Sequence, residues 1–516
     1  ERIEVDNFKL EDTKVNEILP KLERLRKGFA SKKTLDVSFR LDQLKKLRRA
    51  LDRYSKEIAR TNYLDLGFGE YANDVNTMSI VTADIDYVIS EFQGWAKPRS
   101  VDTPILLAPG SSYLYPEPFG VCVIFSAWNS QYQTLIQPIA AALAAGNCVL
   151  AKPSEMACYS AKLVEYILED LDPEVIQVVQ GGADQCIELN KHRSDLIVFT
   201  GSPMKGKLVS KAAAEHLTPC ILELGGQNPV VVDESADLKC AAHNLINGRF
   251  IISGQACISP EYVFVHRSIF NKFRDMLKET VENFFSKDPI TSKDYSRVIN
   301  EWHTDRLANL LKNHGGEVVI GGGECDIKQK YVPPTVISFD NMKTMSQSAL
   351  AKEEIFGPIL SIVPYDNIND CVSYINSKEK PLAMYYFGFD KKNKELLKRN
   401  TSSGALVYND TLVQFATHYL PFGGVGSSGY SAYHGKYGFD NMSHLKPVID
   451  KSSTVVGFRY PPYTGSKLSI MRKVLGLGGL TQSGILKVFL WVAVLLGAFL
   501  LRNNLCGAVD GFINPK

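Results

Sequence analysis

The sequence contains ten cysteines but no C-x-x-C pair. Their scatter fits neither a zinc ribbon nor the disulfide framework of a small secreted domain. The nine histidines form no H-x-x-x-H or H-E-x-x-H set, so metal catalysis has no support. We therefore predict a protein with no bound metal that works in a reducing, cytosolic environment.

A strong charge imbalance, internal repeats and low-complexity segments are also missing. The 58 basic and 56 acidic residues leave a formal net charge of +2, which predicts no nucleic-acid partner. A hydrophobic content of 45% argues against disorder, and 516 residues are enough for two or three domains. Within residues 14–60, apolar side chains recur at three- and four-residue intervals between charged ones, which predicts amphipathic helices with a solvated face.

Only one long apolar run is present, ILKVFLWVAVLLGAFLL at 485–501. Roughly 17–25 apolar residues cross a bilayer core, so we expect a transmembrane anchor here. Arg472, Lys473 and Lys487 precede most of the run, and by the positive-inside rule they predict that the bulk of the protein lies in the cytosol. A buried core helix or an interfacial helix stays open as an alternative.

Between about residues 118 and 233, short apolar runs alternate with helical stretches. This alternation predicts a doubly wound parallel sheet of the α/β class, with a ligand at the carboxyl ends of its strands. The predicted strands are 120–127, 148–154, 175–182, 196–202, 220–226 and 229–233, and the predicted helices are 133–147, 160–171 and 204–217.

A second alternation follows Asp237 and predicts a second α/β domain. Its predicted strands are 262–268, 316–324, 359–366, 383–390 and 404–410, with a helix at 268–285. The predicted organisation is therefore 1–229 for the first domain with its N-terminal helices, 230–410 for the second, 411–463 for a return segment, 464–484 for an amphipathic segment and 485–501 for the anchor.

Two turns after predicted strands suit a nucleotide. In FTGSPMKG, Gly201 and Gly206 allow a tight turn, while Ser202 and the first helical amides face a phosphate. In AKPSE, Lys152 and Glu155 suit ribose hydroxyls, and an acidic side chain repels a 2′-phosphate. Taken alone, the first is also compatible with a plain strand–helix turn and the second with surface charge.

Two further stretches contain reactive side chains. Glu223 lies in the apolar run ILELGG, where burial raises a carboxyl pKa toward the range of a general base. Cys257 lies among small residues in SGQACISPEY, with Gly254 and Ala256 just before it. From these residues alone, Cys257 is equally a buried thiol, and Glu223 is equally an acid that pairs with a lysine.

Seven motifs occur in order along the chain and carry a resemblance to the aldehyde dehydrogenase superfamily. The segment 433–444 and the apolar tail make it most similar to the membrane-anchored fatty aldehyde dehydrogenases of the class 3 branch. The motifs are AWN at 127–129, AKPSE at 151–155, FTGS at 199–202, LELGG at 222–226, SGQACISP at 253–260, EEIFGP at 353–358 and PFGGVGSSG at 421–429.

The resemblance implies a Rossmann-type cofactor domain, a catalytic domain, a small β oligomerisation element that includes about 100–117, and a homodimer. It implies that Cys257 attacks the aldehyde, that Asn129 and the Cys257 amide hold the oxyanion, and that Glu223 activates water against the thioester. NAD is the implied cofactor, with NADP possible. The implied cofactor residues are Trp128, Lys152, Glu155, Gly201, Ser202, Gly206, Leu224, Glu354 and Phe356.

The implied substrates are long-chain aldehydes, which partition into membranes. The tail then anchors the protein to the endoplasmic reticulum, a lipid droplet, the peroxisome or the outer mitochondrial membrane, and 464–484 covers the substrate mouth as a gatekeeper. The sequence departs from the family pattern at Ser130-Gln131-Tyr132 and at Gln227. A coenzyme-A-acylating dehydrogenase and an inactive membrane scaffold are the alternatives.

Overall fold

The computed structural model describes residues 3–453, 455–476, 481–482, 484, 486–487 and 490–495. The chain forms two compact units. The first contains the residues up to Trp95 and Pro118–Ser443, and the second contains Ala96–Glu117 and the residues from His444 onward.

The first unit contains a six-stranded sheet in the order β15-β7-β6-β3-β4-β5. All neighbours are parallel except β15, which runs antiparallel to β7. The first strand in sequence, β3, lies between β6 and β4, so the chain winds outward in both directions and the predicted doubly wound sheet is confirmed. The strands are β3 (Val121–Phe125), β4 (Cys148–Lys152), β5 (Ile176–Val178), β6 (Leu196–Gly201), β7 (Cys220–Leu224) and β15 (Gly429–Tyr430).

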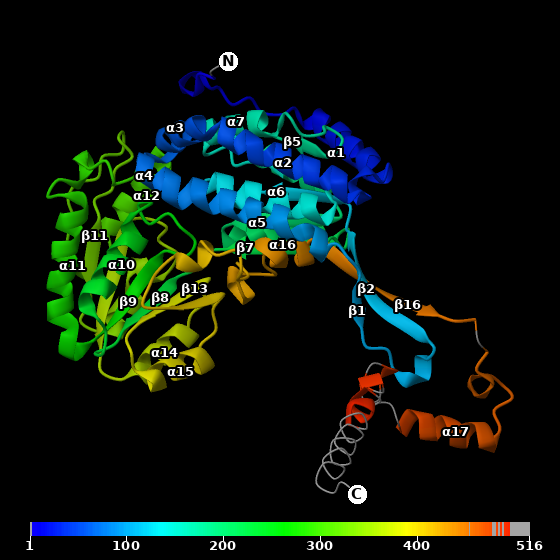
Figure 1. The fold of residues 1–516 in the computed structure, drawn as a ribbon. Coiled ribbons are helices and arrows are strands. Elements are labelled where there is room, and N and C mark those ends of the chain that lie inside the picture. Colours follow the sequence, from blue (N-terminus) through cyan, green and yellow to red (C-terminus); the bar gives the residue numbers. More distant parts are fainter. Residues whose placement is uncertain are drawn as a thin grey trace, which may run out of the picture. The chain divides into compact units, whose positions relative to one another are not determined.

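Helices connect these strands and cover the sheet. Helix α6 (Gln131–Ala145) is buried along its whole length, and its C-cap Gly146 has a left-handed φ of +92° that ends the helix. Helices α2 and α5 pack against α6 (Figure 1). The helices of this part are α1 (Val15–Ala30), α2 (Val37–Arg53), α3 (Ser55–Leu66), α4 (Glu70–Asn73), the π-helical turn η3 (Asp74–Met78), α5 (Ser79–Trp95), α6 (Gln131–Ala145), α7 (Cys158–Leu168), α8 (Ala183–Lys191), α9 (Pro203–Ala214) and α16 (Gly435–Asn441).

A seven-stranded sheet follows in the same unit, in the order β10-β11-β12-β9-β8-β13-β14. Only β10 is antiparallel to its neighbour. Strand β11 has no counterpart among the predicted strands. The strands are β8 (Asn228–Val232), β9 (Pro260–His266), β10 (Glu317–Ile320), β11 (Thr335–Ser338), β12 (Ile359–Tyr365), β13 (Ala383–Phe387) and β14 (Ala405–Tyr408), and the helices are α10 (Leu238–Phe250), α11 (Phe270–Phe285), α12 (Glu301–Lys312), α13 (Met342–Gln347), α14 (Ile368–Asn376) and α15 (Lys391–Asn400).

The second unit contains a three-stranded sheet, in the order β1 (Arg99–Val101), β2 (Gly110–Pro118) and β16 (Ser443–Lys451), and the helix α17 (Gly465–Gly476). No residue of α17 is buried. Among the described residues, no helix is long and apolar enough to cross a membrane. Much of the predicted anchor lies outside the described residues, namely 485, 488–489 and 496–501.

Candidate active site

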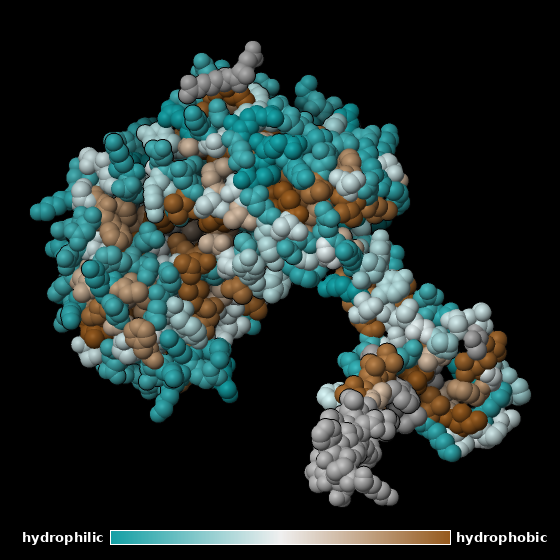
Figure 2. Space-filling view, in the orientation of Figure 1, coloured by the Kyte–Doolittle hydropathy of each residue, from teal (hydrophilic) through white to brown (hydrophobic). Residues whose placement is uncertain are grey.

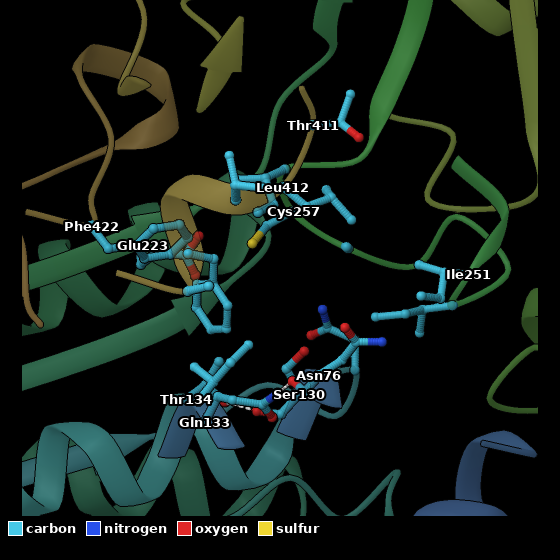
Figure 3. A pocket seen from close by; sticks show the side chains of 18 of the residues that line it. Asn76, Ser130, Gln133, Thr134, Glu223, Ile251, Cys257, Thr411, Leu412 and Phe422 are labelled. Carbon is cyan, nitrogen blue, oxygen red and sulfur yellow. Dashed lines mark hydrogen bonds between the residues drawn. The ribbon is translucent and has the colours of Figure 1, made fainter. Parts of the chain in front are cut away.

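The three predicted catalytic residues line one cavity of about 220 Å³ in the first unit. Asn129 comes from the β3–α6 turn, Glu223 from β7 and Cys257 from the loop between α10 and β9. Figure 3 shows Glu223 and Cys257 at the cavity. These residues lie far apart in sequence. Asn129 and Glu223 lie at the carboxyl ends of β3 and β7, where the α/β topology favours a binding site, and Cys257 comes from the loop that precedes β9.

The loop that carries Cys257 depends on an unusual backbone. Ser253 and Gly254 have φ of +48° and +69°, and a Cβ on Gly254 would lie 2.0 Å from the carbonyl oxygen of Gly357. Glycine is therefore required for this conformation and this contact. Ala256 lines the cavity beside Cys257.

Hydrogen bonds from two buried side chains hold the nucleophile loop. The Asn228 amide donates to the carbonyls of Cys257 at 2.8 Å and Ser259 at 3.0 Å, and its oxygen accepts from the backbone N–H of Ala383. Tyr385 donates to the carbonyl of Ile258 at 2.6 Å. Sequence reasoning missed both roles, although Asn228 directly follows the LELGGQ stretch.

Burial and the nearby Glu223 carboxylate raise the pKa of the Cys257 thiol well above its usual value. The backbone N–H of Cys257 acts in the opposite direction and lowers this pKa. That amide is one of the two donors implied for the oxyanion, a role that stays a prediction.

Glu223 is 1% exposed. Among the described residues, neither of its oxygens has a hydrogen-bond partner of good geometry. Burial raises its pKa to about 7, and the neighbouring Cys257 thiol offsets part of that rise. A carboxyl group with this pKa accepts a proton from water far more readily than an exposed one, which suits it to general-base work.

Several of the predicted cofactor residues lie at or just beyond the carboxyl ends of β4 and β6. Lys152 is buried, donates to the carbonyl of Pro153 at 2.7 Å and lies 3.5 Å from the Glu155 carboxylate. Glu155 is 43% exposed, so its oxygens remain accessible. Ser202 is the N-cap of α9 and accepts from the Lys205 N–H; because Pro203 has no N–H, the Met204 amide is the one that this turn offers to a phosphate.

The two glycines of FTGSPMKG allow neighbouring side chains to pack closely against the backbone. Neither Gly201 nor Gly206 has a positive φ, so the expected tight turn does not explain them. A Cβ on Gly206 would lie 2.6 Å from the Leu224 side chain, and one on Gly201 would lie 2.8 Å from the Phe199 ring. The absence of a side chain at Gly206 therefore lets α9 pack closely against β7, and Leu224 is the β7 residue at this contact.

Aromatic side chains lie beside this region. The Trp128 ring contacts the edge of Phe356 at 5.3 Å and His303 at 5.5 Å between centroids. Phe356 has a φ of +46°, a strained conformation of the kind that occurs at ligand sites. Burial raises the pKa of the Glu354 carboxyl, which lies so close to Gly225 that a Cβ there would be 2.2 Å from its oxygen.

The donor set fits a dinucleotide. Glu155 and Lys152 offer groups for ribose hydroxyls, the N-terminus of α9 with Ser202 suits a phosphate, and Trp128 and Phe356 offer apolar ring faces. When bound, the nicotinamide supplies the hydride acceptor. The protein's own groups then attack the aldehyde (Cys257), stabilise the oxyanion and activate water. These individual roles stay predictions.

The departures from the family pattern have clear places in the structure. Ser130 lines the cavity, whereas the buried Gln131 accepts from the backbone N–H of Ser154 at 2.9 Å and Tyr132 bonds to Thr61. Gln227 donates to the carbonyls of Leu350 and Glu353 at 3.1 and 2.9 Å. Gln227 thereby ties the β7–β8 connection to the segment that leads into Glu354.

The aldehyde dehydrogenase family profile matches residues 9–448. The chain is 40% identical to aldehyde dehydrogenase family 3 member A2 of Mus musculus over 86% of this chain and 92% of that protein. It is 36% identical to the dimeric NADP-preferring aldehyde dehydrogenase of Canis lupus familiaris over 87% of this chain and 98% of that protein.

Solved structures of other proteins superpose on this chain. The substrate-bound state of Staphylococcus aureus AldH superposes with a TM-score of 0.86 at 36% identity, over 89% of this chain and 99% of that chain. A Mycobacterium tuberculosis aldehyde dehydrogenase complexed with NAD⁺ has a TM-score of 0.77 at 23% identity, over 87% of this chain and 92% of that chain, and shows the fold alone.

A half-buried thiol, an amide and a buried carboxyl group lie together beside a doubly wound sheet, and the family match identifies the class as an oxidoreductase of aldehydes. The chain belongs to the aldehyde dehydrogenase family, in its class 3 branch, and the resemblance seen in the motifs is confirmed.

Proposed function

We propose that the protein oxidises long-chain fatty aldehydes to fatty acids with NAD as hydride acceptor, and that NADP is used less well. The supporting observation is the cavity itself, in which Cys257, Asn129 and Glu223 meet apolar side chains such as Ile251, Leu412, Phe415 and Phe422. Figure 2 shows hydrophobic side chains in the hollow between helix α4 and strand β13. Each methylene that leaves water for such a lining contributes about 0.8 kcal/mol.

The first experiment measures NADH formation from hexadecanal by the protein and by Cys257→Ala. Activity in the protein that is lost in the variant supports the proposal, and activity that survives in the variant contradicts it. Analysis of the product with and without coenzyme A separates the hydrolytic enzyme from a coenzyme-A-acylating one. The intact Glu223 favours water as the acyl acceptor, because a buried base beside the thioester activates water directly.

We also propose that residues 485–501 anchor the protein to an intracellular membrane, with the catalytic body in the cytosol and the chain in a homodimer. The apolar run supports this proposal, as do exposed apolar side chains nearby: Leu468, Leu475 and Trp491 are 51%, 58% and 67% exposed. A chain without residues 464–516 should leave the membrane fraction and oxidise long aldehydes with a weaker preference over short ones. An unchanged chain-length profile contradicts the gatekeeper role of 464–484.

A further inference from the structure

The cavity beside Cys257 has two walls of different chemistry. One wall presents mostly aliphatic and aromatic groups, among them Ile251 and Leu412, and the hydroxyl of Thr411 beside Leu412 donates to the carbonyl of Asn244. The other presents the polar residues Asn76, Ser130 and Gln133, which Figure 3 shows together across the cavity from Leu412. A plain hydrocarbon chain matches the first wall only.

Asn76 on the polar wall has an unused hydrogen-bond donor. Its side-chain nitrogen is buried and has no hydrogen-bond partner among the described residues. Its backbone carbonyl accepts a hydrogen bond from the Gln133 side chain at 2.5 Å. Asn76 lies in the π-helical turn η3, a type of turn that occurs often at functional sites.

Thr134 lies on the same wall, but its hydroxyl already has hydrogen-bond partners. Its hydroxyl donates to the carbonyl of Ser130 at 3.0 Å and accepts from the backbone N–H of Ala127 at 3.2 Å. The Thr134 hydroxyl is therefore used within the α6 turn and needs no ligand. The Asn76 amide is not used in this way, and a buried donor without an acceptor is costly.

We propose that the preferred aldehydes carry a second oxygen on the chain, a hydroxyl or another hydrogen-bond acceptor, and that the Asn76 amide recognises it. The apolar wall holds the methylenes while Asn76 donates to the chain oxygen. A site built to bond such an oxygen rejects the analogue that lacks it, because its own polar group then stays unpaired. This inference deepens the proposed function and rests on it for the oxidation of apolar-chain aldehydes at Cys257.

The test compares decanal with a series of hydroxydecanals that differ in the position of the hydroxyl. The full-length protein, Asn76→Leu and Thr134→Val are assayed for kcat and KM with each aldehyde. We expect the unaltered protein to prefer at least one hydroxydecanal, and Asn76→Leu to lower that preference about tenfold through KM, the change typical of one lost hydrogen bond. Thr134→Val should change the kcat/KM of both aldehydes alike.

A preference ratio that is the same in the unaltered protein and in Asn76→Leu overturns the inference. Hexadecanal is assayed in parallel: if it is oxidised while the ratio does not change, the inference alone fails. If hexadecanal is not oxidised but the Asn76-dependent preference is seen, the long-chain proposal fails and the inference stands for shorter chains. Melting temperatures of both variants within a few degrees of the unaltered protein show that the comparison is made on folded enzyme.

Discussion

The Cys257 thiol and the Glu223 carboxylate each shift the pKa of the other. The carboxylate raises the pKa of the thiol, and the thiol lowers the pKa of the carboxyl group, so the resting pair favours a neutral thiol beside a charged carboxylate. Catalysis requires the proton to leave the sulfur. Because burial lifts the Glu223 pKa to about 7, this carboxylate is a far better acceptor for that proton than an exposed one would be.

Replacing this base should trap the acyl-enzyme. Glu223→Gln keeps the size of the side chain but removes its ability to accept a proton from water. We expect a single burst of NADH equal to the enzyme concentration, slower than in the unaltered protein because the thiol also loses its proton acceptor, followed by steady turnover reduced by a factor of ~10²–10⁴. Stopped-flow fluorescence of NADH measures both phases. In the unaltered protein, the hydrolytic step should accelerate as the pH rises through about 7, and an unchanged steady rate in the variant contradicts the role of Glu223.

The same carboxyl group should reduce stability at high pH. Its pKa is about 7 in the native state against an ordinary value of 4.5, so the native state holds a proton that the unfolded state releases between these values. The free energy of unfolding therefore falls as the pH rises through that window, by on the order of 1–3 kcal/mol. Glu223→Gln should melt at a higher temperature than the unaltered protein at pH 8 and at a similar one at pH 4.5.

The partly exposed Glu165 provides the control for that measurement. Its carboxylate bonds to Lys162 on the same helix, and pairs of this kind contribute little to stability. Glu165→Gln should leave the melting temperature nearly unchanged at both pH values. If the melting temperatures of both variants rise equally at pH 8, the rise comes from the change in net charge and not from the burial of Glu223.

The sheet was predictable, whereas much of the site's support was not. Apolar runs bounded by turn residues located β3 to β7, because a strand buried on both faces leaves a strong signal. Strand β11 did not stand out because only Val336 and Ile337 of its residues are apolar and two prolines directly precede it. The role of Asn228 depends on Ala383, and that of Gly254 on Gly357. Contacts between segments this distant leave no periodic pattern in either one.

Asn228 should be a positioning residue for the nucleophile. Asn228→Leu fills the same space but leaves the carbonyls of Cys257 and Ser259 and the N–H of Ala383 without their partner. We expect a loss of about 2–4 kcal/mol in the free energy of unfolding and a fall in kcat larger than any rise in KM. Urea denaturation and steady-state kinetics measure the two effects. Loss of stability with normal kcat in the remaining folded enzyme shows a purely structural role.

Glu155 should control the choice between NAD and NADP. Its exposed carboxylate at the end of β4 suits a ribose 2′-hydroxyl and repels a 2′-phosphate. Glu155→Gln should therefore raise kcat/KM for NADP relative to NAD by about tenfold, mainly through KM. Glu165→Gln, on the helix that follows, should leave the ratio unchanged. An equal change of kcat/KM for both cofactors in Glu155→Gln contradicts the assignment.

Gly254 should tolerate no side chain, for two separable reasons. Its φ of +69° disfavours any L-residue, and a Cβ would lie 2.0 Å from the carbonyl oxygen of Gly357. Gly315 has nearly the same φ, +71°, but nothing within 4 Å of the added carbon. Gly315→Ala should therefore cost about 1–2 kcal/mol from backbone strain alone. Gly254→Ala should cost clearly more and lower the rate of Cys257 alkylation by an aldehyde-mimicking electrophile. Equal costs at the two positions mean that the Gly357 carbonyl moves aside and that this contact does not fix the nucleophile loop.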